Sequence, residues 1–128
     1  MSAPRRRILN VAMNESLLKT RSAILEGAGY EVMSALNLLD IKTACETGKV
    51  FDLVIIGYAI PSGGKRQAMF TIRQYCGQTP ILELYPHGAT PALEEADELL
   101  PSSGEGDTLL AKVSEILAKK RKKARVAS

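Results

Sequence analysis

The sequence predicts an α/β domain built on a doubly wound parallel sheet, and three observations support this prediction. Short apolar segments alternate five times along the chain with segments of helical periodicity, which is the pattern of strands joined by helical crossovers. The clearest strand, residues 51–56, is an apolar run rich in β-branched residues, as expected where helices cover both faces of a sheet. The chain has 128 residues, of which 45% are hydrophobic and 24% charged, and this suits one soluble domain with a single core.

The first half of the chain contains three expected strands, at residues 8–13, 30–33 and 51–56. Between the first two, Asn14 suits a helix N-cap because its side-chain oxygen accepts from free backbone N–H groups of the next turn. Apolar residues in pairs one heptad apart then share one helical face: Leu17, Leu18, Ile24 and Leu25. Gly29 is expected to end this helix, and a weaker helix follows over residues 38–47.

The second half of the chain adds two strands and three helices. A helix follows the loop at residues 60–64 and ends near Tyr75, and the fourth strand covers residues 80–85. A short helix through Leu93 precedes the last strand, at residues 98–100. The final helix has its apolar residues at i, i+1, i+4, i+7 and i+8, namely Leu109, Leu110, Val113, Ile116 and Leu117.

The charge is divided between the body of the chain and its two ends. Nine of the 17 basic residues lie at residues 5–7 and 119–125, which leaves eight basic residues against all 14 acidic residues in between, a net charge of −6 for the body. We therefore expect an acidic domain over residues 1–118 and a basic, frayed tail over residues 119–128. Dense basic runs attract nucleic acid and anionic surfaces, but this tail has no aromatic residue to stack on bases.

The two cysteines and the apolar segments indicate whether the chain has a disulfide framework, a metal site or a membrane span. Cys45 and Cys76 lie in separate segments without metal-ligand spacing, and one pair does not indicate a disulfide framework, so reduced, buried thiols are expected. No apolar run approaches the roughly 20 residues that cross a bilayer. The chain is expected to be cytoplasmic.

Several segments resemble the receiver domains of two-component response regulators. The resemblance covers residues 7–118 and lies in residues 7–11, in residues 28–32, and in residues 51–56 with Ile60-Pro61 beyond them. Further matches are Arg73, Pro80 and residues 96–100, which fall where the family has an arginine, the proline before the fourth strand, and the fifth strand. The resemblance implies a flavodoxin-like sheet of five parallel strands in the order 2-1-3-4-5 with five helices around it.

The chemistry of that family is missing from this sequence. In receivers an aspartate after the third strand accepts a phosphoryl group, acidic residues hold Mg²⁺, and a hydroxyl group and a lysine bind the phosphate. The corresponding positions, which we call the vestigial phosphorylation positions, are Ala12, Met13, Gly57, Tyr85 and Ser102. Gly57 stands at the acceptor position and Ala12 and Met13 at the acidic pair. We therefore expect no catalytic residue, no metal ion and no cofactor.

Other polar residues near these positions have less specific interpretations. Asp52 opens the third strand, about 16 Å upstream of the acceptor position at strand rise and at the wrong end of the sheet. Glu83 shares a strand face with Tyr85, and a hydrogen-bond partner under a loop is favoured over a metal or acid role. His87 is expected to be a surface loop residue rather than a phosphate acceptor. The sequence from Ser62 to Lys65 superficially suggests a phosphate cradle but lacks the P-loop spacing.

Tyr85 carries one further expectation. Small residues stand where larger polar side chains usually meet, and protein interiors do not leave such space empty. The tyrosine ring is therefore predicted to pack near Gly57 and Ser102 and to hold the loop after the fourth strand in one state.

The resemblance implies a stand-alone pseudo-receiver of a two-component (phosphorelay) system, a non-enzymatic module that acts by phosphorylation-independent contact with a signalling protein partner. A homodimer through the helix-4, strand-5, helix-5 face on which receivers associate is the second form of contact considered. Two alternatives stay open. One is nucleic-acid or anionic-surface binding through the basic tail, and the other is an enzyme or small-ligand binder that uses the crevice at the carboxyl ends of the strands.

Overall fold

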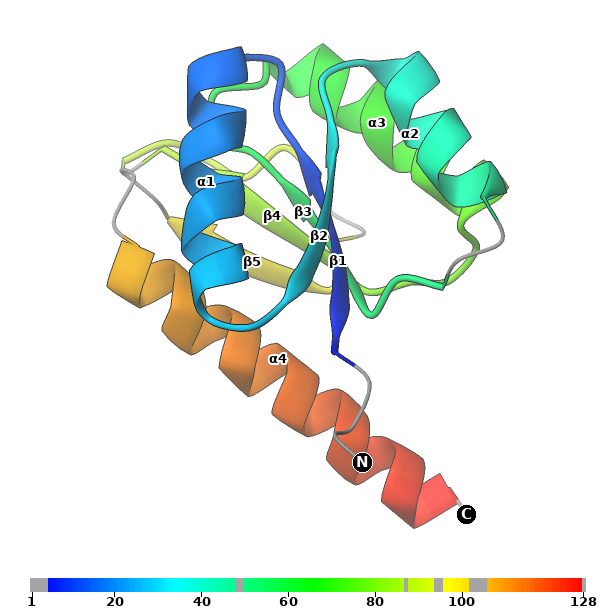
Figure 1. Ribbon diagram of the computed structural model, residues 1–128. Coiled ribbons are helices and arrows are strands. Elements are labelled where there is room, and N and C mark those ends of the chain that lie inside the picture. Colours follow the sequence, from blue (N-terminus) through cyan, green and yellow to red (C-terminus); the bar gives the residue numbers. More distant parts are fainter. Residues whose placement is uncertain (1–4, 48–49, 87, 94–95, 102–105, 128) are drawn as a thin grey trace.

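The computed structural model describes residues 5–47, 50–86, 88–93, 96–101 and 106–127, with side chains as far as Lys119 (Figure 1). Within these ranges the chain forms five strands, in parallel and in the spatial order β2-β1-β3-β4-β5, as predicted. The strands are β1 (Arg7–Val11), β2 (Glu31–Ala35), β3 (Leu53–Ile56), β4 (Ile81–Tyr85) and β5 (Glu98–Pro101). The helices are α1 (Glu15–Gly27), α2 (Leu38–Glu46), α3 (Ser62–Tyr75) and α4 (Gly106–Ala127).

Two layers of helices cover the sheet, with α1 and α4 on one face and α2 and α3 on the other (Figure 1). The strand side chains alternate between two apolar clusters: Leu9 and Val54 pack with α2 and α3, whereas Ile8 and Ile55 pack with α1 and α4. All four residues of β3 are fully buried, as its uninterrupted apolar sequence indicates for a central strand.

The N-cap prediction for the first helix is confirmed. The side-chain oxygen of Asn14 accepts a hydrogen bond of 3.0 Å from the backbone N–H of Leu17. Asn37 caps α2 in the same way through the backbone N–H of Asp40, over 2.8 Å. Each asparagine satisfies a donor that the first helical turn leaves without a partner, which fixes where these helices begin.

The prediction of five helices is wrong, because the described residues between β4 and β5 form turns and no helix. Pro86 and Pro91 lack the backbone N–H that a helix interior requires. The next donors are used elsewhere: the N–H groups of Ala92 and Leu93 bind the carboxylate of Glu83, each over 2.8 Å. The segment still contributes to the core, since Leu93 is buried against the cluster under α3.

The last helix extends into the basic tail. Instead of fraying after Lys119, the helical backbone of α4 continues to Ala127, and its last turns extend past the sheet (Figure 1). The basic tail is therefore a continuation of α4. None of the helices in the described part of the chain has the length and apolar composition needed to cross a membrane.

The expectation of reduced, buried thiols is also wrong. Cys45 near the end of α2 and Cys76 directly after α3 form a disulfide, with their Cα atoms 5.2 Å apart, and both residues are only half-buried. The Cα separation lies in the usual range for bridged cysteines. The sequence separation of 31 residues gives no hint of this pairing, which arises because α2 and α3 pack side by side and end near each other (Figure 1).

Candidate functional site

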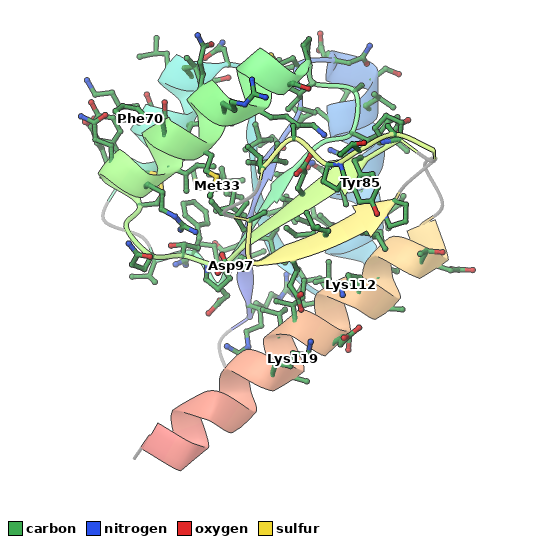
Figure 2. The ribbon with its side chains drawn as sticks, turned by 180° about the vertical axis from the view of Figure 1, so that it is seen from behind. Met33, Phe70, Tyr85, Asp97, Lys112 and Lys119 are labelled. Carbon is green, nitrogen blue, oxygen red and sulfur yellow. A yellow bond between two sulfur atoms is a disulfide. The ribbon has the colours of Figure 1, made fainter. Side chains whose placement is uncertain are left out.

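The carboxyl ends of β1 and β3 bring three of the vestigial phosphorylation positions to one edge of the sheet. The backbone N–H of Gly57 donates to the carbonyl oxygen of Val11 over 2.9 Å, so the residue after β3 lies beside the end of β1. Ala12 follows Val11 and is buried, whereas Met13 is 43% exposed. Tyr85 ends β4 and is half-buried, and Figure 2 shows it at the same end of the sheet. The edge thus contains backbone and apolar groups where receivers carry carboxylates.

Two of the sequence candidates, Ser102 and His87, lie outside the described residues. A third, Asp52, lies just before β3, at the opposite end of the strand from the acceptor position. Its Oδ2 accepts a hydrogen bond of 2.8 Å from the backbone N–H of Arg7, and its Oδ1 lies 3.4 Å from Nη1 of Arg6. The prediction that Asp52 occupies the wrong end of the sheet is confirmed, and its contacts join the N-terminal segment to β3.

The side chain nearest to the missing Cβ of Gly57 is that of Arg21. A Cβ atom at this glycine would lie 3.0 Å from Nη1 and 3.3 Å from Nη2 of Arg21, and 3.1 Å from the carbonyl oxygen of Val11. None of the three atoms nearest to this place belongs to Tyr85, and the packing of its ring near Gly57 and Ser102 stays a prediction. The guanidinium group of the buried residue Arg21, on α1, thus lies beside Gly57, and this residue is small enough to admit it.

A buried amide holds this guanidinium in position. Asn10, in the middle of β1, is fully buried, and its Oδ1 accepts a hydrogen bond of 3.2 Å from Nη1 of Arg21. Its Nδ2 donates to the carbonyl oxygen of Leu18 over 3.2 Å and to Oγ of Ser22 over 3.0 Å. The Ser22 hydroxyl lies 2.8 Å from the hydroxyl of Ser34 on β2. We refer to Asn10, Arg21, Ser22 and Ser34 as the Asn10 network.

Burial has a cost for the charged form of Arg21. Desolvation lowers the pKa of its guanidinium, and the nearby Tyr58 acts in the opposite direction. An arginine starts from a pKa so high that it stays protonated at neutral pH. The structure therefore places a permanent positive charge at the edge of the sheet.

A second buried cation lies on the other face of the same edge. Lys65, in the first turns of α3, is 3% exposed, and its Nζ donates to Oε2 of Glu83 and to the carbonyl oxygen of Leu84, each over 2.8 Å. The carboxylate of Glu83 is fully buried and also accepts the backbone N–H groups of Ala92 and Leu93. The interpretation of Glu83 as a hydrogen-bonded residue under a loop is confirmed. The ammonium group of Lys65 is held by these acceptors and is not presented to a phosphate.

The charges at this edge do not form a metal site. In the described part of the chain, no three histidine, cysteine, aspartate or glutamate side chains lie together in a way that would hold a metal ion. Mg²⁺ requires several oxygen ligands, whereas the one buried carboxylate at this edge, that of Glu83, is already bound to Lys65.

Sequence reasoning alone does not single out Arg21, although a signal for it exists. Arg21 follows Leu18 by three residues and precedes Leu25 by four, so it lies on the buried face of its helix. Asn10 likewise interrupts an otherwise apolar strand. A charged residue on an apolar helical face, opposite a polar residue on a central strand, is the pattern that would have identified the network.

Comparisons with known proteins show which other proteins have this fold. No family model matches the sequence, and no curated protein matches it either. Among solved structures, the chemotaxis protein CheY4 of Vibrio cholerae is 22% identical with a TM-score of 0.74, over 88% of this chain and 99% of that one. A CheY-like receiver domain protein from Methanospirillum hungatei is 21% identical with a TM-score of 0.77, over 94% of this chain and 99% of that one. The receiver domain of the hybrid histidine kinase CckA is 23% identical with a TM-score of 0.70, over 87% of this chain and 98% of that one. The chain therefore has the fold of CheY-like response-regulator receiver domains.

Proposed function

We propose that this chain is a pseudo-receiver, a signalling module of a two-component (phosphorelay) system that acts by contact with a protein partner and without phosphorylation. The observation that carries the proposal is the pair formed by Gly57 and Arg21. Where a receiver has its acceptor carboxylate, this chain has no side chain, and a guanidinium group lies 3.0 Å from the place of the missing Cβ.

The acceptor chemistry requires groups that this edge lacks. An aspartyl-phosphate forms only on a carboxylate, and its Mg²⁺ needs further oxygen ligands nearby. Gly57, Ala12 and Met13 carry no oxygen on their side chains. Arg21 adds a positive charge beside Gly57, and like charges repel. A divalent cation is therefore disfavoured here by both missing ligands and charge.

The segment after β4 supports a single conformation. The Lys65–Glu83 ion pair joins α3 to β4, and Glu83 holds the backbone of Ala92 and Leu93. The side chains of Lys65 and Glu83 are withdrawn from water, so breaking the pair would leave a buried charge without a partner. A switch needs two states of similar free energy, and this arrangement favours one. A partner would recognise a constant surface.

That surface differs from the face on which receivers associate. The described residues between β4 and β5 contain no helix, so the corresponding face consists of β5 and α4. Figure 2 shows Lys112 and Lys119 of α4 beside β5, where Lys119 lies 3.1 Å from a carboxylate oxygen of Glu98. Leu99, the next residue of this edge strand, is 41% exposed. We assign protein contact to this β5–α4 face.

The direct test is the intact mass of the protein after treatment with acetyl phosphate and Mg²⁺. We expect no added phosphoryl group, and we expect beryllofluoride with Mg²⁺ to leave the amide spectrum unchanged. An active receiver treated in parallel supplies the positive control. A stable phosphoryl adduct on any aspartate or on His87 would overturn the proposal.

The second candidate function is binding of nucleic acid or an anionic surface, and the continuous helix α4 favours it. The helix carries the basic run from Lys119 to Lys123 past the sheet (Figure 1). Binding of duplex DNA would then weaken steeply with salt. Truncation after Ala118 would abolish it, whereas partner binding through the β5–α4 face would survive the truncation.

A further inference from the structure

We propose that Arg21 and Gly57 form a binding site for a small oxyanion, a phosphate or a carboxylate, at the carboxyl edge of the sheet between β1 and β3. The site is distinct from a phosphorylation site, because it needs no metal ion and forms no covalent bond. It also goes beyond the proposed function, which concerns a protein partner on another face.

The guanidinium group of Arg21 has N–H donors that have no protein acceptor in the described residues. In the described residues, Arg21 makes one side-chain hydrogen bond, from Nη1 to Asn10, and no ion pair. No buried side-chain nitrogen or oxygen in this part of the chain lacks a hydrogen-bond partner. Since Nε and Nη2 of Arg21 make no such bond, they must reach the solvent, although the residue as a whole is 6% exposed. Arg21 is thus a deeply set cation whose Nε and Nη2 donors no protein group accepts in the described residues.

The charge balance around Arg21 favours an anion. Lys65 is the other buried cation at this edge, and it is neutralised by Glu83 at 2.8 Å. The neutral positions Ala12, Met13 and Gly57 contribute nothing to offset the guanidinium. A buried charge is costly unless it is paired. A bound oxyanion would supply the missing charge through paired N–H donors, the geometry in which arginine binds phosphate and carboxylate groups.

Gly57 is the residue that lets the guanidinium group lie this close to the backbone after β3. Any side chain would start 3.0 Å from Nη1 and 3.3 Å from Nη2, closer than carbon atoms normally lie to such groups. A larger residue would therefore move the guanidinium or cover it. An aspartate at this position would place a carboxylate next to the guanidinium. In the Gly57→Asp variant, this carboxylate would compete with an external oxyanion for the Arg21 guanidinium.

Asn10 prepares the site without using up its charge. It binds Nη1 through a neutral amide oxygen, and its own donors are taken by Leu18 and Ser22. The guanidinium is therefore fixed in orientation while its charge stays uncompensated. Preorganised donors of this kind lose little freedom when a ligand binds.

The test is an NMR titration of the ¹⁵N-labelled full chain with two probes, inorganic phosphate and acetate. The reporters are the Nε–H resonance of Arg21 and the backbone amide of Gly57. Because they belong to single residues, phosphate bound at the basic end of α4 does not interfere. We expect saturable shifts of both reporters. Saturation by phosphate alone would identify a tetrahedral ligand, and saturation by both probes a site that also accepts carboxylates; either supports the proposal.

Three variants complete the experiment. Arg21→Met should abolish the shift of Gly57, and Gly57→Asp should abolish the response of Arg21. Lys19→Met removes an exposed cation of the same helix, paired only along the helix with Glu15, and should leave the titration unchanged. If Arg21→Met does not fold, the response of Arg21 in the Gly57→Asp variant tests the proposal instead.

Three results would overturn the proposal: no saturable shift at the reporters, an unchanged shift of Gly57 in Arg21→Met, or saturable shifts with MgCl₂ alone. The last would indicate an inherited cation site. Phosphorylation by acetyl phosphate would contradict the pseudo-receiver proposal but leave this titration intact, so the two can fail separately.

Discussion

Nζ of Lys65 lies 2.8 Å from Oε2 of Glu83, and both side chains are almost completely withdrawn from solvent. The lysine comes from the start of α3 and the glutamate from the middle of β4, eighteen residues further along the chain. Glu83 also binds two backbone N–H groups of the segment that leads to β5. One ion pair therefore joins a helix, a central strand and a connecting segment.

The first prediction concerns this pair. Lys65→Met leaves the carboxylate of Glu83 buried without its cation, and we expect a loss of about 3 kcal/mol in the free energy of unfolding. The double variant Lys65→Met/Glu83→Gln removes both charges and should recover part of that loss. Urea unfolding measures both, with Lys19→Met as an exposed control that should cost less than about 0.5 kcal/mol. Equal losses for Lys65→Met and Lys19→Met would show that the pair contributes nothing.

The second prediction uses the contact between Gly57 and Arg21. Gly57→Asp should pair with the guanidinium and unfold with a free energy about 1 kcal/mol higher than that of Gly57→Asn, its uncharged match. A paired carboxyl group has a lowered pKa, so this advantage is present above the ordinary aspartate value of about 3.9 and is lost as the pH falls below it. Urea unfolding at pH 7 and pH 3 tests this. An advantage that persists at low pH would mean that charge pairing is not its cause.

The third prediction concerns Tyr85, which is half-buried at the end of β4 and supplies none of the three atoms nearest to the missing Cβ of Gly57. Tyr85→Ala should lower the free energy of unfolding by about 1 kcal/mol, the usual size for a residue outside the core. The same urea measurement decides it. A loss of about 3 kcal/mol, typical of a fully packed ring, would show that the tyrosine supports the core after all.

The fourth prediction concerns the Cys45–Cys76 disulfide. It closes a loop with a sequence separation of 31 residues, so reduction should lower the free energy of unfolding by about 3 to 4 kcal/mol in the loop-entropy estimate. The double variant Cys45→Ala/Cys76→Ala should not respond to the reductant. A thiol titration of the untreated, unfolded protein provides the check, since two free thiols would contradict the bond.

The strands could be predicted from the sequence because each lies in a short, largely apolar segment. The parallel order followed from the resemblance and from the preference of such sheets for right-handed crossovers. The sequence could not show that the helix predicted through Leu93 is absent from the described residues. Its backbone donors are taken by Glu83, nine and ten residues earlier in the chain, and local periodicity carries no information about such a contact.

The lack of carboxylates at the candidate site could be predicted from the sequence, whereas the contact between Arg21 and Asn10 could not. At the positions that resemble the acceptor and its acidic pair, the sequence has Gly57, Ala12 and Met13, none of which carries a carboxylate. Arg21 lies on α1 and Asn10 on β1, so only the folded structure shows that the two side chains are hydrogen-bonded. The disulfide belongs to the same class, since Cys45 and Cys76 meet through the packing of α2 on α3.

The Asn10 network also determines which way β1 faces. Side chains alternate along a strand, so a slip of one residue would turn Asn10 away from Arg21 and Ser22 and into the apolar cluster under α2 and α3. There its amide would lose three hydrogen bonds, at the cost of a buried polar group without partners. The neighbouring apolar residues Ile8, Leu9 and Val11 fit either face, and they tolerate a slip far better than Asn10 does. One asparagine therefore specifies the register of the central strand pairs, and with it the single arrangement in which the chain folds.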